Sequence, residues 1–184
     1  MLELDFQNPN QFSNIPEIDD FQQWAEMGLQ RNIGDSSQSR SADGNSGVDD
    51  YSIVIRISTE AESQQLNNDY RQKNTPTNVL SFPFEMPDLP EVAWVEPRHL
   101  GDLIFCEAII VKEAAAQNKT LFQHWAHLVI HGMLHLQGFD HINDGDAVIM
   151  ESKEIHLLDQ LGFPDPYQGS YQQPHQNPNG NADE

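Results

Sequence analysis

The chain has 184 residues and a formal net charge of −20, with 29 acidic residues against 9 basic ones. That charge disfavours non-specific nucleic-acid binding, which depends mainly on neutralising phosphates with Lys and Arg. The sequence also lacks an apolar run of the ~20 residues that a membrane span needs, a signal peptide, and a second cysteine to pair with Cys106. We therefore expect a cytoplasmic protein that does not enter a membrane.

The first third of the chain predicts two strands, one helix and a long polar loop. Residues 2–6 (LELDF) alternate apolar and polar side chains, the period of a half-buried strand, and apolar residues recur at helical spacing between 21 and 29. Residues 34–50 are rich in Gly, Ser and Asp and predict a mobile loop within the domain. Residues 51–57 (YSIVIRI) form the clearest strand of the chain.

The middle third predicts a helix, two strands and a second helix. A capping-box pattern at Thr59 begins a helix that runs to about Arg71. Residues 79–84 (VLSFPF) and 100–106 (LGDLIFC) are predicted strands, separated by a loop rich in Pro and acidic residues. Residues 107–118 continue as a helix.

The last third predicts two helices and a tail. A second capping box at Thr120 begins a helical pattern that runs to Gly138, and residues 144–161 form a last helix. Residues 168–184 are acidic and polar with almost no apolar content, so we expect a disordered tail. The whole pattern predicts one domain over residues 1–167, with an α+β fold in which a small mixed four-stranded sheet packs with about five helices.

The helix that begins at Thr120 ends in the motif HGMLHLQGFDH. His131 and His135 are one helical turn apart on the same face, so both imidazoles can bind one ion. Gly138 can adopt the positive φ that turns the chain back and brings His141 to the same ion. Three neutral imidazoles with a fourth position open to water is the arrangement of catalytic zinc sites, whereas structural sites normally have four protein ligands. We therefore predict one Zn²⁺ per chain.

Two alternatives bear on this prediction. His127 lies one turn before His131 and could compete as a ligand, but it is further from the turn, so we interpret it as packing or as support for a ligand. The spacing is also that of zincin-type proteases with HExxHxxGxxH, in which the glutamate is the general base. Here that position is Gly132, which cannot accept a proton, so peptidase activity is not expected. The other histidines are interpreted as ordinary polar residues: His99, His124, His156 and His175.

The motif resembles the HGxLHLxGxDH signature of the YbeY family, bacterial metal-dependent endoribonucleases of ribosomal RNA maturation. Residues 66–85, LNNDYRQKNTPTNVLSFPFE, resemble the family block LNxxYRxxxxPTDVLSFPxE, and LGDLIFC is similar to its LGDI strand. The sequence MESKEIHLLDQLGFPDPY is similar to the family's terminal helix, so the resemblance covers roughly residues 50–167. Two departures stand out: Asn78 replaces the usual aspartate, and residues 34–50 form an enlarged loop.

The resemblance implies roles for particular residues. It implies His131, His135 and His141 as zinc ligands and Arg71 as a functional residue facing the metal, where a guanidinium could bind a phosphodiester at two points. Without the resemblance, Arg71 would be interpreted as a solvated residue at a helix end. Asp140 could orient an imidazole from behind, although a turn at a helix end also explains an aspartate there. The departure at residue 78 puts a carboxylate role at that site in doubt.

The resemblance also implies a function. It implies a single-strand-specific endoribonuclease that acts in maturation of the 3′ end of small-subunit ribosomal RNA and in ribosome assembly or quality control. The partners implied are ribosomal RNA, small-subunit ribosomal proteins and an assembly GTPase. The alternative is a non-catalytic ribosome-assembly factor with a structural zinc, which the charge of −20 slightly favours because a basic protein partner would place an acidic protein better than bare RNA would. The open fourth ligand position and Arg71 favour the enzyme.

Overall fold

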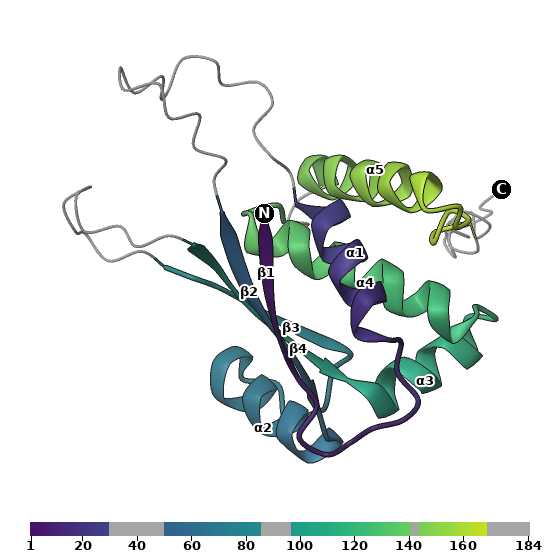
Figure 1. Ribbon diagram of the computed structural model, residues 1–184. Helices are drawn as coiled ribbons and strands as arrows, with labels where there is room; N and C mark the ends of the chain where they lie inside the picture. The colour runs from purple at the N-terminus through teal and green to yellow at the C-terminus, as the bar shows by residue number, and fades with distance from the viewer. Residues whose placement is uncertain (30–49, 86–96, 141–143, 169–184) are drawn as a thin grey trace, which may run out of the picture.

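The computed structural model of the chain describes residues 1–29, 50–85, 97–140 and 144–168. Within these ranges lie five helices and four strands (Figure 1), which confirms the predicted α+β fold. In chain order, the elements are β1 (Leu2–Gln7), α1 (Ile18–Gly28), β2 (Tyr51–Ser58), α2 (Glu60–Arg71), β3 (Val79–Pro83), β4 (Arg98–Cys106), α3 (Glu107–Ala116), α4 (Leu121–Leu136) and α5 (Asp144–Gln160).

The four strands form one mixed sheet in the order β1-β2-β4-β3. β1 and β4 both pair parallel with β2, whereas β3 runs antiparallel to β4 at the edge of the sheet. The alternation in β2 buries Ile53, Ile55 and Ile57 in the main hydrophobic core. Figure 1 shows α1 and α4 on one side of the sheet and α2 on the other. Because α4 packs along β3 and β4, the edge strand lies beside the predicted metal-binding helix.

Aromatic side chains and one glycine fix α4 against the rest of the fold. The Trp125 ring lies 5.4 Å from that of Phe21 in α1 and 5.5 Å from that of Phe105 in β4, measured between centroids. Further along, α4 approaches β4 so closely that a Cβ atom at Gly132 would lie 2.8 Å from the Leu103 side chain. These contacts bury the apolar face of α4 and turn its histidine-bearing face toward α3, α5 and the start of β3.

The predicted loop at 34–50 and the predicted tail at 168–184 lie almost wholly outside the described residues. Both remain predictions, as does the extent of the single domain, 1–167. Within the part of the chain that the structure describes, no helix combines the length and the apolar character needed to cross a membrane.

Candidate metal centre

A row of histidines follows one face of α4. The helix begins where the sequence predicts, because the Thr120 hydroxyl accepts a hydrogen bond from the Gln123 backbone N–H at 3.2 Å and the Gln123 side chain accepts one from the Thr120 N–H at 3.2 Å. From this start, spacings of three and four residues place successive side chains above one another. The histidines of the row are His124, His127, His131 and His135.

The imidazoles of His131 and His135 face each other through their Nε2 atoms, which lie 3.1 Å apart. Two nitrogens bound to one tetrahedral zinc ion at about 2.0–2.1 Å would lie about 3.3–3.4 Å apart. The Nδ1 atom of His131 lies 2.7 Å from a Glu154 carboxylate oxygen, and that of His135 lies 2.9 Å from the Phe139 carbonyl oxygen. Both partners are acceptors, which favours the tautomer with the proton on each Nδ1 and lets each Nε2 act as a metal ligand. A cation between them fits this arrangement.

The turn after α4 orients the second of these rings. Gly138 adopts a φ of 86°, as predicted, and its N–H donates to the His135 carbonyl oxygen at 3.0 Å. The chain therefore folds back and brings the Phe139 carbonyl oxygen within reach of the His135 ring. His141, the predicted third ligand, lies outside the described residues. Asp140 is half-buried just before it, and both roles remain predictions.

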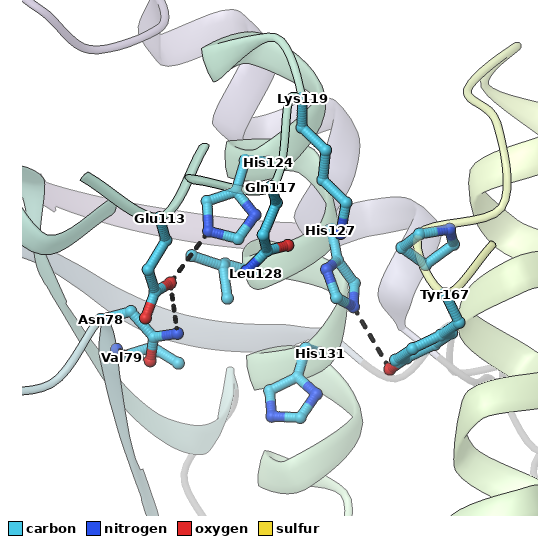
Figure 2. A pocket seen from close by; sticks show the side chains of 11 residues that line it. Asn78, Val79, Glu113, Gln117, Lys119, His124, His127, Leu128, His131 and Tyr167 are labelled. Carbon is cyan, nitrogen blue, oxygen red and sulfur yellow. Dashed lines mark hydrogen bonds and ion pairs between the residues drawn. The ribbon is translucent and has the colours of Figure 1, made fainter. Parts of the chain in front are cut away.

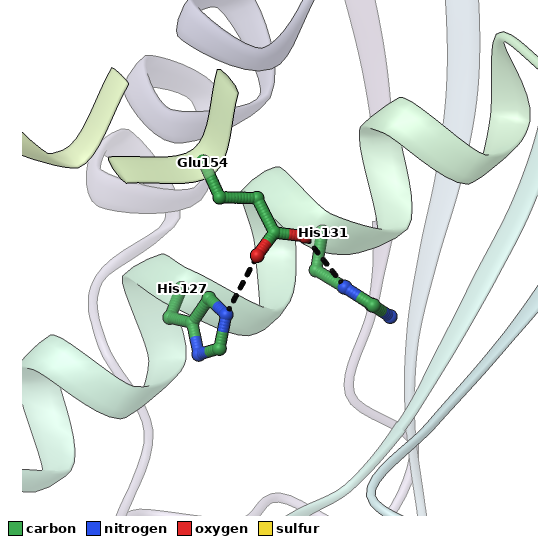
Figure 3. Close-up of side chains that lie close together, drawn as sticks. All are labelled: His127, His131 and Glu154. Atoms are coloured by element: carbon green, nitrogen blue, oxygen red, sulfur yellow. Dashed lines mark hydrogen bonds and ion pairs between the residues drawn. The ribbon is translucent and has the colours of Figure 1, made fainter. Parts of the chain in front are cut away.

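Glu154 of α5 joins the row of histidines from the opposite side (Figure 3). Glu154 is 0% exposed. One of its carboxylate oxygens accepts a hydrogen bond from His131, and the other accepts one from His127 at 3.1 Å. The Tyr167 hydroxyl donates to the oxygen that His127 contacts. Burial alone would raise the pKa of Glu154, but the hydrogen bonds from both histidines outweigh it and hold the pKa well below its usual range. The carboxylate is therefore a permanent anion behind the His131 ring.

The sequence predicts a role for neither Glu154 nor Tyr167. A signal for Glu154 is visible in α5, where it occupies the same buried face as Met150, Leu157 and Leu158. An acidic residue at an apolar position of an amphipathic helix must have a buried partner. The sequence gives no equivalent signal for Tyr167, which lies in the turn region after α5.

His127 is the residue that the sequence suggests as support for a ligand or, alternatively, as a competing ligand. Its Nε2 atom lies 3.1 Å from Glu154 and 3.3 Å from the Tyr167 hydroxyl. Burial lowers its pKa, against the opposing effect of the Glu154 carboxylate. A second set of metal-ligating atoms thus exists, because His127, His131 and Glu154 each place one such atom within 4.8 Å of the others. His131 belongs to both sets.

A cavity of about 590 Å³ opens beside His131, between α3, α4 and the start of β3 (Figure 2). On its wall, one Glu113 carboxylate oxygen accepts from His124 Nε2 and from the Asn78 amide, each at 2.9 Å. Burial alone would raise the pKa of Glu113, but these two contacts lower it. His124 is 2% exposed, so it is a buried polar residue that pairs with Glu113 and not a solvated one. Asn78 is a donor to the same carboxylate.

Arg71 lies exposed in the last turn of α2. Thr59 caps this helix as predicted, since its hydroxyl accepts from the Glu62 N–H at 3.2 Å. Among the described residues on the cavity wall, Lys119 is the lysine or arginine side chain, and Arg71 is not part of that wall. The functional role of Arg71 remains a prediction.

The chain is similar to known proteins over most of its length. A family model for "Endoribonuclease YbeY" matches residues 13–162. Proteins named Endoribonuclease YbeY from Colwellia psychrerythraea and Pseudoalteromonas translucida are 47% and 48% identical to this chain, over 84% and 90% of it and over 90% and 95% of their own lengths. Another, from Alcanivorax borkumensis, is 56% identical over 66% of this chain and 69% of its own length. A solution structure of a Thermotoga maritima protein is 20% identical over 88% of this chain and 92% of its own, with a TM-score of 0.49.

Proposed function

The chain belongs to the endoribonuclease YbeY family, and we propose that it is a metal-dependent hydrolase that cleaves phosphodiester bonds of single-stranded RNA. The observation that carries the proposal is the pair of Nε2 atoms of His131 and His135, which lie 3.1 Å apart while both Nδ1 atoms face acceptor oxygens. Neutral imidazoles arranged in this way are ligands for a borderline-soft ion such as zinc.

The proposed centre has one ion per chain, bound by His131 and His135 and by His141, which the sequence supplies. When bound, zinc would supply Lewis-acid chemistry, either by polarising a phosphoryl oxygen or by lowering the pKa of a water molecule toward ~7. Glu154 holds the His131 ring in the tautomer whose Nε2 can bind a metal, as outer carboxylates do in other zinc sites. Arg71 is proposed to bind the phosphodiester and to stabilise the charge that gathers on its oxygens.

The substrate proposed for this centre is ribosomal RNA, at the 3′ end of the small-subunit RNA. Small-subunit ribosomal proteins and an assembly GTPase are the proposed partners, and the cytoplasm is the proposed compartment. The family resemblance supports the substrate and the partners. The single cysteine, Cys106, is a buried free thiol, which suits a reducing compartment.

A second candidate is a ribosome-assembly factor whose metal is structural. The net charge of −20 favours it, because an acidic chain gains little from the phosphate attraction that dominates RNA affinity. The cavity beside His131 favours the enzyme, because it leaves room for a substrate at the metal and because a structural site is closed by protein ligands.

The deciding experiment measures metal content and RNA cleavage on the same preparation. We expect one zinc ion per chain and cleavage of single-stranded RNA that stops on chelation and returns with zinc. Arg71→Glu should keep its metal and its melting temperature but lose at least about 10²-fold in kcat, the effect of removing one donor to a developing oxyanion. Arg71→Lys should keep part of the activity, because an ammonium retains the charge without the planar two-point fork. A zinc-loaded chain that binds RNA without cleaving it would favour the assembly factor.

A further inference from the structure

One lysine lies on the wall of the cavity beside His131. Lys119 follows the end of α3 and directly precedes Thr120, which caps α4. Its backbone is fixed, because Asn118 adopts a left-handed φ of 54° and the Lys119 N–H donates to the Ala114 carbonyl oxygen at 2.9 Å. The side chain therefore starts from a rigid point between two helices, as a positioned binding residue requires.

Lys119 is a half-buried cation without an ion pair in the part of the chain that the structure describes. Burial lowers its pKa, and the charges of Asp165 and Glu113 partly oppose that effect. Neither carboxylate forms an ion pair with the Lys119 ammonium group among the described residues. Glu113 accepts from His124 and Asn78, and Asp165 accepts from the Tyr167 backbone N–H at 2.8 Å. An ammonium that loses water without gaining a protein partner is unfavourable in isolation and suited to an anionic ligand.

The ammonium group lies close to the candidate metal centre. Figure 2 shows the Lys119 side chain extending along α4 to His127, and its charge contributes to lowering the pKa of His127. His127 is one turn of α4 before His131, a rise of about 5–6 Å along the axis. Lys119 and His131 therefore line the same cavity, with His127 on the wall between them along α4.

The groups around the lysine favour a phosphate over other anions. The Gln117 amide and the His127 ring share the cavity wall with Lys119, and such groups commonly contact the RNA backbone. The chain has 9 basic residues against 29 acidic ones, so one cation inside the cavity changes the local potential far more than on a basic protein.

We propose that Lys119 binds the RNA phosphate adjacent to the one at His131 and so positions the strand along the cavity. The proposal rests on the proposed function, since it names a residue that binds that substrate. Lys119 is a positioning residue here, because it contacts the neighbouring phosphate and not the bond that is cleaved. It thus contributes to binding of substrate and not to the chemical step.

The test compares Lys119→Gln with Lys112→Gln in the full-length, zinc-loaded chain. Lys112 is the matched control, because it is an exposed lysine of α3 that pairs with Glu60 at 2.6 Å. The probe is a short fluorescent single-stranded RNA of mixed sequence, followed by cleavage and by anisotropy. Lys119→Gln should raise KM about tenfold with kcat nearly unchanged, the effect of removing one charge-assisted hydrogen bond. It should also reduce the slope of log affinity against log salt by about 0.7, the value for one phosphate on a single strand.

Lys119→Arg should restore KM and the salt slope, since a charge returns to the same place. A merely structural lysine would lower the melting temperature and leave the salt slope unchanged, and that result overturns the proposal. The same holds if Lys119→Gln and Lys112→Gln behave alike, or if the wild-type chain binds no RNA. Wild-type protein that binds RNA without cleaving it contradicts the proposed function alone, because anisotropy still reports the contribution of Lys119.

Discussion

Replacing Glu154 by Gln separates the two sets of metal ligands that the structure offers. The carboxylate is buried and accepts from His131, His127 and Tyr167 through its two oxygens. A glutamine has the same shape but one acceptor oxygen, and its amide N–H would face an imidazole that is itself a donor. At least one histidine must then lose its partner or change tautomer. If Glu154 only supports His131, the metal should still bind, but more weakly.

The size of the effect follows from the hydrogen bonds that a glutamine cannot accept. Removing the outer carboxylate behind a metal-bound imidazole costs about 10–100-fold in metal affinity, and removing one charge-assisted hydrogen bond from the metal-free fold costs about 1.5–3 kcal/mol. Because the folded pKa of Glu154 lies below the usual value for glutamate, its contribution to stability is present above that usual value and is lost as the pH falls through the folded pKa. The variant should therefore be less stable than wild type at pH 7, with a gap that shrinks in acid.

Metal affinity is measured by competition with a chromophoric chelator, alongside His135→Ala and His127→Ala. In the proposed centre, His135→Ala abolishes tight metal binding. His127→Ala and Glu154→Gln only weaken the metal affinity, by about 10–100-fold. The reasoning is refuted if Glu154→Gln and His127→Ala each abolish binding and His135→Ala does not. That outcome would make His127, His131 and Glu154 the ligands. His131→Ala should abolish binding in either case and serves as the common control.

The same geometry makes three further predictions. Asn78→Asp would place two carboxylates against each other where the amide now donates to Glu113 at 2.9 Å, which should raise the pKa of one of them. Chemical denaturation should show that the free energy of unfolding falls by about 1–2 kcal/mol above that raised pKa. The loss should disappear as the pH falls below it, because the carboxyl is then neutral. Gly132→Ala should lower the midpoint of urea unfolding. Overpacking against Leu103 costs about 1–3 kcal/mol, which outweighs the gain in helix propensity of about 1 kcal/mol. An unchanged or higher midpoint would show that the Leu103 side chain moves aside. Chelation should lower the melting temperature of the zinc-loaded chain, because the metal stabilises the folded state to which it binds. Calorimetric zinc titrations should show weaker binding below about pH 6, because neutral imidazole is the ligand form. A zinc affinity that does not depend on pH would contradict imidazole ligands.

The local signals in this sequence predict local structure well. The N-cap at Thr59, the capping box at Thr120, the alternation of Ile53, Ile55 and Ile57, and the positive φ of Gly138 all stand where the patterns predict them. Each depends on residues within a few positions of one another, so spacing along the chain is enough to identify it.

The interactions that complete the site depend on residues far apart in the chain. Glu154 meets His131 across 23 positions, and Asn78 meets Glu113 across 35. Such pairs are set by how α5 and β3 pack against the histidine row, which spacing along one element does not encode. His124 shows the same limit, because its polar side chain is buried to pair with Glu113.

The electrostatics of the site bear on proton transfer, which Gly132 cannot perform. Glu113 and Glu154 are the carboxylates that meet the histidine row in the described part of the chain, and histidine donors lower the pKa of both. A carboxylate held ionised by two donors is a strong acceptor but a weak base, and general bases work best with a pKa near the working pH. Both groups therefore orient imidazoles. The base that accepts the nucleophile's proton therefore lies outside this pair, and Gly132, packed on Leu103, does not supply one.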